Sequence, residues 1–507
     1  MQSEQEALVT AFTEGRVDGA PAPVQRIDTH LSHVFLCGAL AFKLKRAIAL
    51  PFVDFSTLQA RHAACQEELS VNRAFADALY LDVRAIARTS DGRFSVAAQA
   101  HHESDIVDWV VVMRRFDGAL QFDRMAGDGA LTRAHIEEAA SVVARAHANA
   151  KPQTLTGHAV DYRGIIHELR ETEAHGAQKL GLSPAAPSLF ERLEFELTRI
   201  SSHIEHRREA GKVRRCHGDL HLRNICLFEG KALPFDALEF DAHLATIDVL
   251  YDFAFLLMDL RHVGRPDLAN AAMNAYWDAA SEDEAALALL PFFMSLRAAV
   301  RMAVAVEAGD LEEAQAYRAL GTELLQQTSS ELVAIGGLSG VGKSAIARAV
   351  AWRLPGPAGA RVLRTDVLRK RSIGKPVNEA APDDAYTPTH RAEIYNDATL
   401  RAAAAFQAGA SAIFDATFQE SNLRRAIVEA LQGKKLHAIW LHAPLSVRLA
   451  RIAGRKGDAS DADAEVAAAQ QEPGDQLTQP WRLINAERPI EDIAEEIAAE
   501  IKTSPRA

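Results

Sequence analysis

A short polar stretch, CHGDLHLRN at Cys216–Asn224, places an Asp two residues after a His and an Asn five residues after that Asp. A carboxylate in such a loop can accept the proton of a hydroxyl group, and a side-chain amide oxygen can bind a magnesium ion. This spacing is typical of phosphoryl transfer, with Asp219 as the base and Asn224 as a metal ligand. We expect His217 to hold the loop through hydrogen bonds rather than to carry a proton.

Acidic residues farther along the chain extend this group. Asp236 follows Asn224 by twelve residues, within LPFDALEF, where a second magnesium ligand is expected. Glu239 and Asp241 are alternatives for that ligand. Asp252 lies at the start of an apolar helical stretch, from which its carboxylate can brace the loop.

A cation for the nucleotide phosphates is predicted ahead of the first long helix. Lys43 lies there in the strand-like segment AFKLK, and Glu68 on the helix is its expected ion-pair partner. Lys45 competes with Lys43 for this role, and Glu67 competes with Glu68. The alternative is a solvated lysine on an edge strand that has no role in nucleotide binding.

The elements that must position these side chains follow one another as sheet, helix and sheet. Alternating apolar residues predict two strands within residues 33–50 and a hairpin that turns at Glu229-Gly230. A helix is predicted over residues 55–76, with Ser56 or Thr57 as its N-cap. Further strands are predicted at 81–88, 93–100 and 105–116, and helices at 132–150, 160–180, 187–210 and 248–261.

The motifs HGDLHLRN, FDALEFD and IDVLYDFAFLLMDL together resemble the aminoglycoside phosphotransferase and choline-kinase-like family. The resemblance covers roughly residues 25–328. It implies a bilobal protein-kinase-like fold that phosphorylates a hydroxyl with ATP, with an N-lobe at about 25–118 and a helical C-lobe at about 119–328. It also implies a hinge in WVVVMRRF, where backbone near Met113 reads adenine. THLSHV (29–34) stands where a glycine-rich phosphate loop would be expected.

A second motif, GLSGVGKS, fits the GxxxxGK[ST] pattern of a Walker A loop, between an apolar strand and a helix. Backbone amides of the loop would wrap the β-phosphate, the lysine would reach the β- and γ-phosphates, and the serine would bind magnesium. Strands and helices alternate from here on, which predicts a doubly wound parallel sheet. The residues assigned to the nucleotide are Gly337, Ser339, Gly340, Val341, Gly342, Lys343 and Ser344.

Carboxylates are predicted at the ends of the next two strands of this sheet. Asp366 closes LRTD and Asp415 closes AIFD. Strand ends in an open parallel sheet face the ligand crevice. Asp366 is therefore expected to accept the proton of the acceptor hydroxyl, with Arg369 beside it, and Asp415 to join the magnesium shell.

Three arginines near residue 450 recur at helical spacing before a polar segment: Arg448, Arg451 and Arg455. They suit a lid that neutralises the transferred phosphate, and a solvated basic helix face is the alternative. With Asp366-x-x-Arg369 and DATF, they make this part resemble the small P-loop kinases that include polynucleotide kinase, gluconate kinase and zeta-toxin-like enzymes. The whole arrangement resembles bacterial bifunctional proteins that combine these two domains.

The composition sets limits on the class of protein. The 507 residues are 48% apolar and 24% charged, which is normal for a globular protein of two or three domains. The four cysteines form no CxxC pair, the N-terminus does not resemble a signal peptide, and no apolar run approaches a membrane span, so we expect a cytoplasmic protein. The net charge of −12 disfavours a nucleic-acid partner.

These features predict a multidomain protein of the α/β and α+β class, with a protein-kinase-like domain at 1–328 and a P-loop domain at 329–507. The leading hypothesis is a tandem kinase with two ATP–Mg²⁺ sites, acting on hydroxyls of small molecules such as a sugar or nucleoside. A second hypothesis makes the first domain a nucleotide or metabolite sensor that regulates the second. A third is a nucleic-acid 5′-hydroxyl kinase, for which a basic stripe would be expected.

Overall fold

The chain is seen here in a computed structural model. It describes residues 2–50, 53–97, 105–180, 188–280, 282–377, 379–431, 435–454, 460–473, 477 and 480–503. Contacts within the chain divide it into two compact units. One consists of residues 1–164 and 204–259, and the other of residues 165–203 and 260–507.

The first unit is built on a seven-stranded sheet with the strand order β1-β8-β7-β9-β4-β3-β2. Its neighbours pair antiparallel, except that β1 and β8 run parallel. The predicted strand 93–100 is confirmed as far as Ala97, and residues 98–100 lie outside the described residues. The strands are β1 (Val17–Asp18), β2 (Val24–Asp28), β3 (Ser32–Cys37), β4 (Leu40–Lys45), β7 (Tyr80–Arg88), β8 (Phe94–Ala97) and β9 (Ile106–Arg114), with β5 (Ala49–Leu50) and β6 (Val53–Asp54) as a separate pair.

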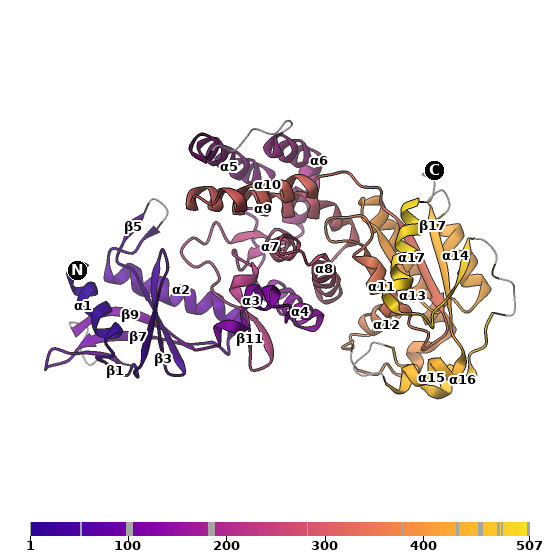
Figure 1. Cartoon of the computed structure of the whole chain (residues 1–507), viewed down its shortest axis with the longest axis horizontal. Helices are drawn as coiled ribbons and strands as arrows, with labels where there is room; N and C mark the ends of the chain where they lie inside the picture. The colour runs from indigo at the N-terminus through magenta and orange to yellow at the C-terminus, as the bar shows by residue number, and fades with distance from the viewer. Residues whose placement is uncertain are drawn as a thin grey trace. The chain divides into compact units, whose positions relative to one another are not determined.

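Helices cover both faces of this sheet. Helix α2 (Leu58–Ala76) packs against the face that carries Val111, and the side chain of Thr57 caps it, as predicted. Helix α1 (Gln2–Thr13) packs against the face that carries Val110, where Phe12 stacks on Phe35 with ring centroids 4.4 Å apart. Because successive residues of a strand point to opposite faces, the two helices lie on opposite sides (Figure 1).

The rest of the first unit is mostly helical and carries the predicted hairpin. A buried ion pair joins α6 to β13, since Arg207 donates to both carboxylate oxygens of Asp248 at 2.8 and 2.9 Å. The elements are η2 (Gly118–Leu120), α3 (Phe122–Gly127), α4 (Arg133–Asn149), the start of α5 (Ala159–Leu180), the end of α6 (Leu189–Glu209), β10 (Val213–Arg215), η3 (Leu222–Asn224), the hairpin strands β11 (Ile225–Phe228) and β12 (Lys231–Pro234), β13 (Thr246–Asp248) and most of α7 (Val249–His262).

The second unit contains further helices ahead of a second sheet: α8 (Pro266–Ala280), η4 (Glu284–Leu289), α9 (Leu290–Ala308) and α10 (Leu311–Leu324). The continuous stretch Glu284–Ala308 has the length and composition of a membrane span, although no such span was predicted from the sequence. Within the protein, 78% of its most apolar window is buried, as in a core helix.

The second sheet is fully parallel, with the strand order β15-β16-β14-β17-β18. Helices alternate with its strands, which confirms the doubly wound fold class (Figure 1). The elements are β14 (Leu332–Gly337), α11 (Lys343–Ala351), β15 (Arg361–Arg364), α12 (Thr365–Ser372), η5 (Asp383–Tyr386), α13 (Pro388–Gln407), β16 (Ala412–Asp415), α14 (Ser421–Ala430), β17 (Leu436–His442), α15 (Leu445–Ala453), α16 (Ala464–Ala469), β18 (Trp481–Asn485) and α17 (Ile490–Thr503).

The two faces of this sheet can be followed on strand β16. Ile413 packs in one apolar cluster with Ile346 of α11 and Ile493 of α17. The next residue, Phe414, points to the other face and contacts Tyr395 of α13, with ring centroids 5.6 Å apart. The strand is therefore buried on both sides, which explains why the sequence AIFD is apolar without alternation.

The predicted boundary at residue 328 marks a change of architecture, since α10 ends at Leu324 and β14 begins at Leu332. The compact units are divided elsewhere, because the helices from residue 260 onward belong with the P-loop sheet. The domain limits 1–328 and 329–507 therefore stay a proposal about sequence modules.

The buried pair between Arg207 and Asp248 provides a test of the first unit. Replacing Arg207 by Ala leaves a buried carboxylate without its cation, so we expect the free energy of unfolding to fall by about 3–5 kcal/mol. Arg199→Ala on the same helix removes an exposed pair with Glu196 and should cost less than about 1 kcal/mol. Urea unfolding followed by circular dichroism would measure both, and equal losses would contradict the assignment.

Candidate active sites

The Walker A loop connects β14 to α11 in the predicted way. Gly337 has a φ of 140°, and a Cβ there would lie 2.6 Å from the Leu441 carbonyl oxygen, so only glycine fits. Ser344 at the start of α11 donates to Asp415 Oδ2 at 2.6 Å. Lys343 Nζ donates to the Leu338 carbonyl at 3.2 Å. The loop therefore brings the predicted serine and the predicted strand-end carboxylate together.

A hollow of about 890 Å³ opens in front of this loop. The P-loop residues from Ser339 to Ile346 line one part of it, and polar side chains from later elements line the rest. Of the predicted site residues, it brings together Ser339, Gly340, Val341, Gly342, Lys343, Ser344, Asp366, Arg369, Asp415 and Arg451. Residues without a predicted role also line it: Tyr386, Arg391, Tyr395, Thr417 of the DATF motif, Glu420, Asp461 at the end of the predicted lid segment, and Gln470.

The prediction that Asp366 ends a strand is wrong in detail. Strand β15 ends at Arg364, and Asp366 lies in the first turn of α12. Helical spacing then places Arg369 beside it, with Arg369 Nη1 donating to Asp366 Oδ1 at 2.7 Å. The guanidinium of Arg369 also lies 4.6 Å from the ring centroid of Tyr386.

Asp461, from a later part of the chain, also lines the hollow. Its carboxylate accepts from Tyr386 Oη at 2.5 Å, from Lys370 Nζ at 2.8 Å and from the Ala381 amide at 3.0 Å. Burial, followed by this hydrogen bond, raises the pKa of Tyr386. No motif identifies Tyr386, whereas Asp461 belongs to the polar end of the predicted arginine-rich lid segment, for which no contact was predicted.

The three predicted lid arginines lie in different settings. Arg448 is buried and donates to the carbonyls of Ser339 and Ala467, so it supports the loop from behind instead of forming a lid. Arg451 lines the hollow and donates to the carbonyls of Val341 and Ala486 at 2.7 and 2.8 Å. Arg455 lies outside the described residues.

The carboxyl group of Asp415 is buried, and this affects its pKa. Burial raises its pKa, and the nearby charges of Arg364 and Lys343 oppose that rise. A carboxylate that accepts a hydrogen bond from a serine hydroxyl beside the phosphate-binding loop suits a magnesium shell, because magnesium prefers oxygen ligands of this kind. Ser344 and Asp415 thus fit as the residues that would hold magnesium.

In the first unit, two lysines of strand β4 share one buried carboxylate. Lys43 Nζ lies 2.7 Å from Glu68 Oε1, and Lys45 Nζ lies 2.5 Å from Glu68 Oε2. Lys43 also contacts Asp236, and Lys45 contacts Glu239. Burial lowers the pKa of Lys43, but the charges of Asp236 and Glu68 outweigh it and hold that pKa well above its ordinary value.

These contacts separate the alternatives for the first site. Glu67 faces Arg215, at 3.5 Å, so Glu68 is the partner of Lys43. Glu239 is engaged by Lys45, and Asp241 accepts from the backbone amide of His243 at 2.7 Å.

The position of Asp236 suits a metal ligand in the first unit. Its side chain is 45% exposed, and its backbone has a φ of 62°, uncommon for a residue with a side chain. The Tyr80 hydroxyl accepts from its amide at 3.0 Å and holds it in that conformation.

The loop of Asp219 and Asn224 is held from both sides. Asn224 Nδ2 donates to Asp219 Oδ2 at 2.9 Å, and His221 Nε2 lies 3.2 Å from the same oxygen. From behind, Asp252 accepts from the Gly218 amide at 2.7 Å, as predicted for the brace. His217 is buried and bonds to the Phe235 carbonyl at 3.0 Å, which agrees with an architectural role.

Met113 lies inside the sheet, where its register partners are Ala41 and Tyr80. It is buried in an apolar cluster at whose margin Phe116 and Phe235 are partly buried, with ring centroids 4.9 Å apart. The adenine-reading role of backbone near Met113 stays a prediction.

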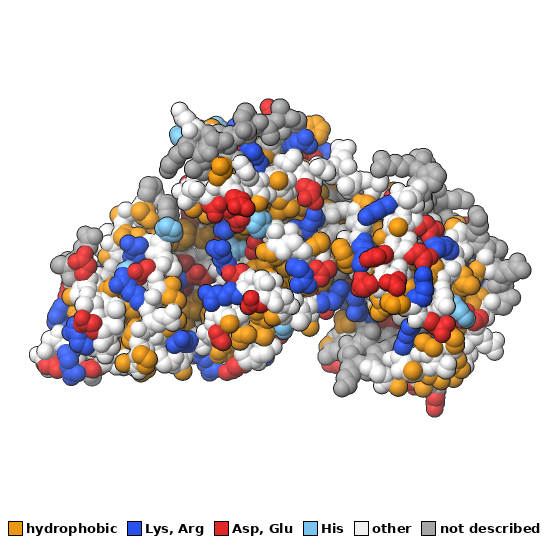
Figure 2. All heavy atoms as spheres, in the orientation of Figure 1, with side chains coloured by type: hydrophobic (Ala, Val, Ile, Leu, Met, Phe, Trp, Pro, Cys, Tyr) orange, Lys and Arg blue, Asp and Glu red, His pale blue; other side chains and the backbone are white. Residues whose placement is uncertain are grey.

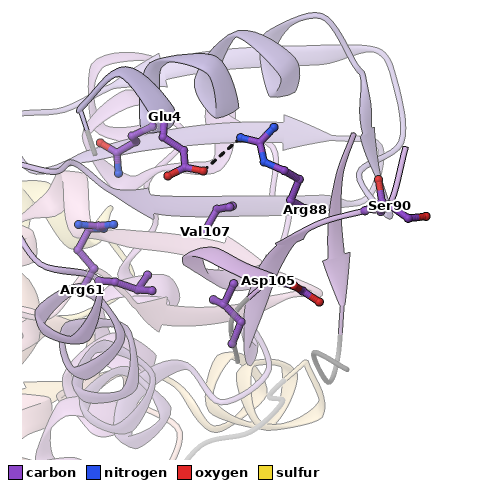
Figure 3. A pocket seen from close by; sticks show the side chains of 10 residues that line it. Glu4, Arg61, Arg88, Ser90, Asp105 and Val107 are labelled. Carbon is purple, nitrogen blue, oxygen red and sulfur yellow. Dashed lines mark hydrogen bonds and ion pairs between the residues drawn. The ribbon is translucent and has the colours of Figure 1, made fainter. Parts of the chain in front are cut away.

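A further hollow of about 530 Å³ lies where the end of β7 and the start of β9 meet residues of α1 and α2 (Figure 3). Arg88 pairs across it with Glu4 at 3.1 Å, and Arg61 pairs with Asp108 at 2.8 Å. Both of its guanidinium groups are therefore paired with carboxylates of the protein.

Comparisons with known proteins place the chain in a family. A family model described as an AAA domain matches residues 332–476. The protein Mb2027c of Mycobacterium bovis and the protein Rv2004c of Mycobacterium tuberculosis H37Rv are each 30% identical to this chain over 466 residues, covering 87% of the chain and 88% of the relative.

Among solved structures, a gluconokinase from Sinorhizobium meliloti is 21% identical, with a TM-score of 0.25, over 34% of this chain and 93% of that one. An amicoumacin kinase in complex with AMP-PNP, Ca²⁺ and Ami is 15% identical, with a TM-score of 0.39, over 65% of this chain and 97% of that one. The chain thus belongs to the same family as the two mycobacterial proteins, and residues 332–476 are similar to an AAA domain.

Proposed function

We propose that the P-loop site transfers the γ-phosphoryl group of ATP to a hydroxyl of a small molecule. The observation that carries this proposal is one hollow in which Ser344 and Asp415 are hydrogen-bonded and Asp366 lies with Arg369. A phosphate-binding loop, a place for magnesium and a carboxylate that can take a hydroxyl proton are the parts that phosphoryl transfer needs.

Each residue has one role in this proposal. The loop amides and Lys343 bind the β- and γ-phosphates, and Ser344 and Asp415 would hold the magnesium that offsets phosphate charge. Asp366 accepts the acceptor proton, with Arg369 fixing its orientation through the 2.7 Å hydrogen bond. Arg451 neutralises the transferred phosphoryl group, a role we also assign to Arg455.

We propose a second site of the same kind in the first domain. Lys43, paired with Glu68, would bind the nucleotide phosphates, and adenine would lie near Met113. Asn224 and Asp236 would hold magnesium, and Asp219 would accept the proton of the second hydroxyl. The two sites make the chain a tandem kinase.

One observation favours the alternative in which the first domain is a nucleotide or metabolite sensor. The turn between β2 and β3 is closed by Thr29, whose amide donates to the Ser32 carbonyl at 2.9 Å and whose hydroxyl accepts from the Ser32 amide at 2.9 Å. In this turn side chains would face a phosphate. In a glycine-rich loop the backbone amides could approach the phosphate more closely.

Small acceptors are favoured over a nucleic-acid 5′ end. The net charge of −12 disfavours a phosphate backbone as the acceptor. On the face shown in Figure 2, acidic and basic side chains are interspersed. The four cysteines are free and buried, which suits the cytoplasm.

Single substitutions separate the two proposed sites. Lys343→Ala should lower ATP turnover at the P-loop site by roughly 10²–10³-fold, because it removes a preorganised cation from the transferred phosphate. Asp219→Asn should abolish phosphorylation of whichever acceptor the first domain uses and leave the other product unchanged. Mass spectrometry of a metabolite extract incubated with ATP–Mg²⁺ and each variant would measure both. Unchanged products with Lys343→Ala would refute the P-loop proposal, and nucleotide binding by the first domain with no Asp219-dependent product would favour the sensor.

The buried Asp415 predicts a pH dependence. Because burial raises the pKa of Asp415, its carboxylate takes up a proton at a higher pH than an ordinary carboxyl group does. As the pH is lowered, magnesium-dependent ATP affinity should therefore begin to fall above the usual carboxyl range. Asp415→Asn should weaken that affinity by about 10- to 100-fold and flatten its pH profile. Fluorescent-nucleotide titration across pH, with the exposed Asp492→Asn as control, tests this, and an unaltered profile in Asp415→Asn would count against the assignment.

A further inference from the structure

Strand β15 lies at the edge of the P-loop sheet, where side chains of helix α8 bond to its Val362 amide and to carbonyls just before the strand. Asn270 Nδ2 donates to the carbonyls of Ala358 and Ala360 at 2.7 and 2.9 Å. One turn later on α8, Asn274 Nδ2 donates to the Ala360 carbonyl at 3.1 Å, and its Oδ1 accepts from the Val362 amide at 2.7 Å. Two asparagines four residues apart on one helix therefore take the place of a neighbouring strand.

A buried arginine fastens the same strand to the helical segment. Arg361 is 1% exposed, and its guanidinium donates to Asp278 at 2.6 Å, Asn274 at 3.0 Å and Glu284 at 3.4 Å. Glu284 also accepts from Arg401 of α13 at 3.0 Å. A buried cation without these acids would be costly, so the network fixes how β15 lies on α8 and η4.

The strand held in this way carries the acceptor half of the site. Strand β15 ends at Arg364 and α12 begins at the next residue, so Asp366 in the first turn of α12 and Arg369 one turn later both face the hollow. Helix α12 has its own link to α8, because Arg371 Nη1 donates to the Trp277 carbonyl at 3.4 Å and lies 4.0 Å from Asp278 Oδ1.

The nucleotide half of the site is built on a different part of the sheet. The Walker A loop follows β14, which is separated from β15 by β16 and is flanked by β17 on its other side. A change in how α8 holds β15 should therefore move Asp366 and Arg369 while leaving the phosphate loop in place.

We propose that α8 and η4, which precede the P-loop domain in the chain, are its positioning element. Asp278 acts through Arg361 and Arg371, and Glu284 through Arg361, to set the place of Asp366 and Arg369 against the phosphate loop. This inference rests on the proposed P-loop kinase function, and it makes residues outside the P-loop motif region determinants of its turnover.

The test uses the full chain with Asp278→Asn and with Arg371→Ala, which removes the α12 link but leaves the buried Arg361 network intact. Amide hydrogen exchange should accelerate in residues 361–372 and not in residues 332–351. Slow ATP–Mg²⁺ hydrolysis, with water as the acceptor, should fall roughly tenfold or more with an unchanged ATP dissociation constant, because small misplacement of a proton acceptor costs turnover and not nucleotide binding. Asp278→Glu should restore part of the rate.

Arg353→Ala is the matched control, because Arg353 is largely buried in the same unit and pairs with Glu491 of α17 at 2.6 Å. It should leave exchange in residues 361–372 and ATP hydrolysis unchanged. Unchanged exchange and turnover in both test variants would overturn the inference, as would equal acceleration over 332–351 in Arg371→Ala, which would mark a general structural role. If the Lys343→Ala variant hydrolysed ATP as fast as the wild type, the proposed function itself would be overturned instead.

Discussion

The pairing of buried charges is the constraint on which both units depend. In the first unit, Glu68 lies between Lys43 and Lys45, and in the second Arg361 lies among Asp278, Asn274 and Glu284. Taking a lone charge out of water costs several kcal/mol, so each cation fixes the elements that bring its acids. Through these pairs a sheet is joined to a neighbouring helix, α2 in the first unit and α8 in the second.

The two proposed sites share a way of supporting their loops. Asp252 holds the backbone of the Asp219 loop from a helix behind it, and Arg448 holds the carbonyl side of the Walker A loop. In each case a buried charged side chain bonds to backbone groups that face away from the substrate. The groups that face the hollow are thereby kept in place before any ligand binds, which is the form of preorganisation that electrostatic catalysis requires.

The buried network in the second unit also changes what counts as its P-loop domain. A parallel sheet ordinarily ends in a strand with open backbone groups, which the protein must protect. Here asparagine side chains of α8 occupy those groups, and Gly359, with a φ of 72°, leaves room for the approach of Asn270. The helices that precede the P-loop sheet are therefore part of its hydrogen bonding, and the residue where the motifs begin is not where the compact unit begins.

Local patterns were sufficient for much of the prediction. The order of strands and helices, the cap at Thr57, the hairpin at Glu229-Gly230, the Walker A loop and the brace from Asp252 all depend on short-range spacing, turn chemistry and apolar periodicity, which the sequence displays directly. Asp366 was expected at a strand end because the switch from β15 to α12 occurs within two residues, and no pattern that short distinguishes the two.

Only the tertiary structure decided which distant groups meet. Glu68 rather than Glu67 pairs with Lys43, and Arg448 bonds to a carbonyl of the Walker A loop. Asp461 accepts a hydrogen bond from Tyr386, and Asn274 bonds to an edge strand some ninety residues later in the chain. The sequence by itself determined the two motifs and the two kinds of fold, because both are written in local spacing. Contacts between residues far apart in the chain are set by packing and by the pairing of buried charges, which no local pattern encodes.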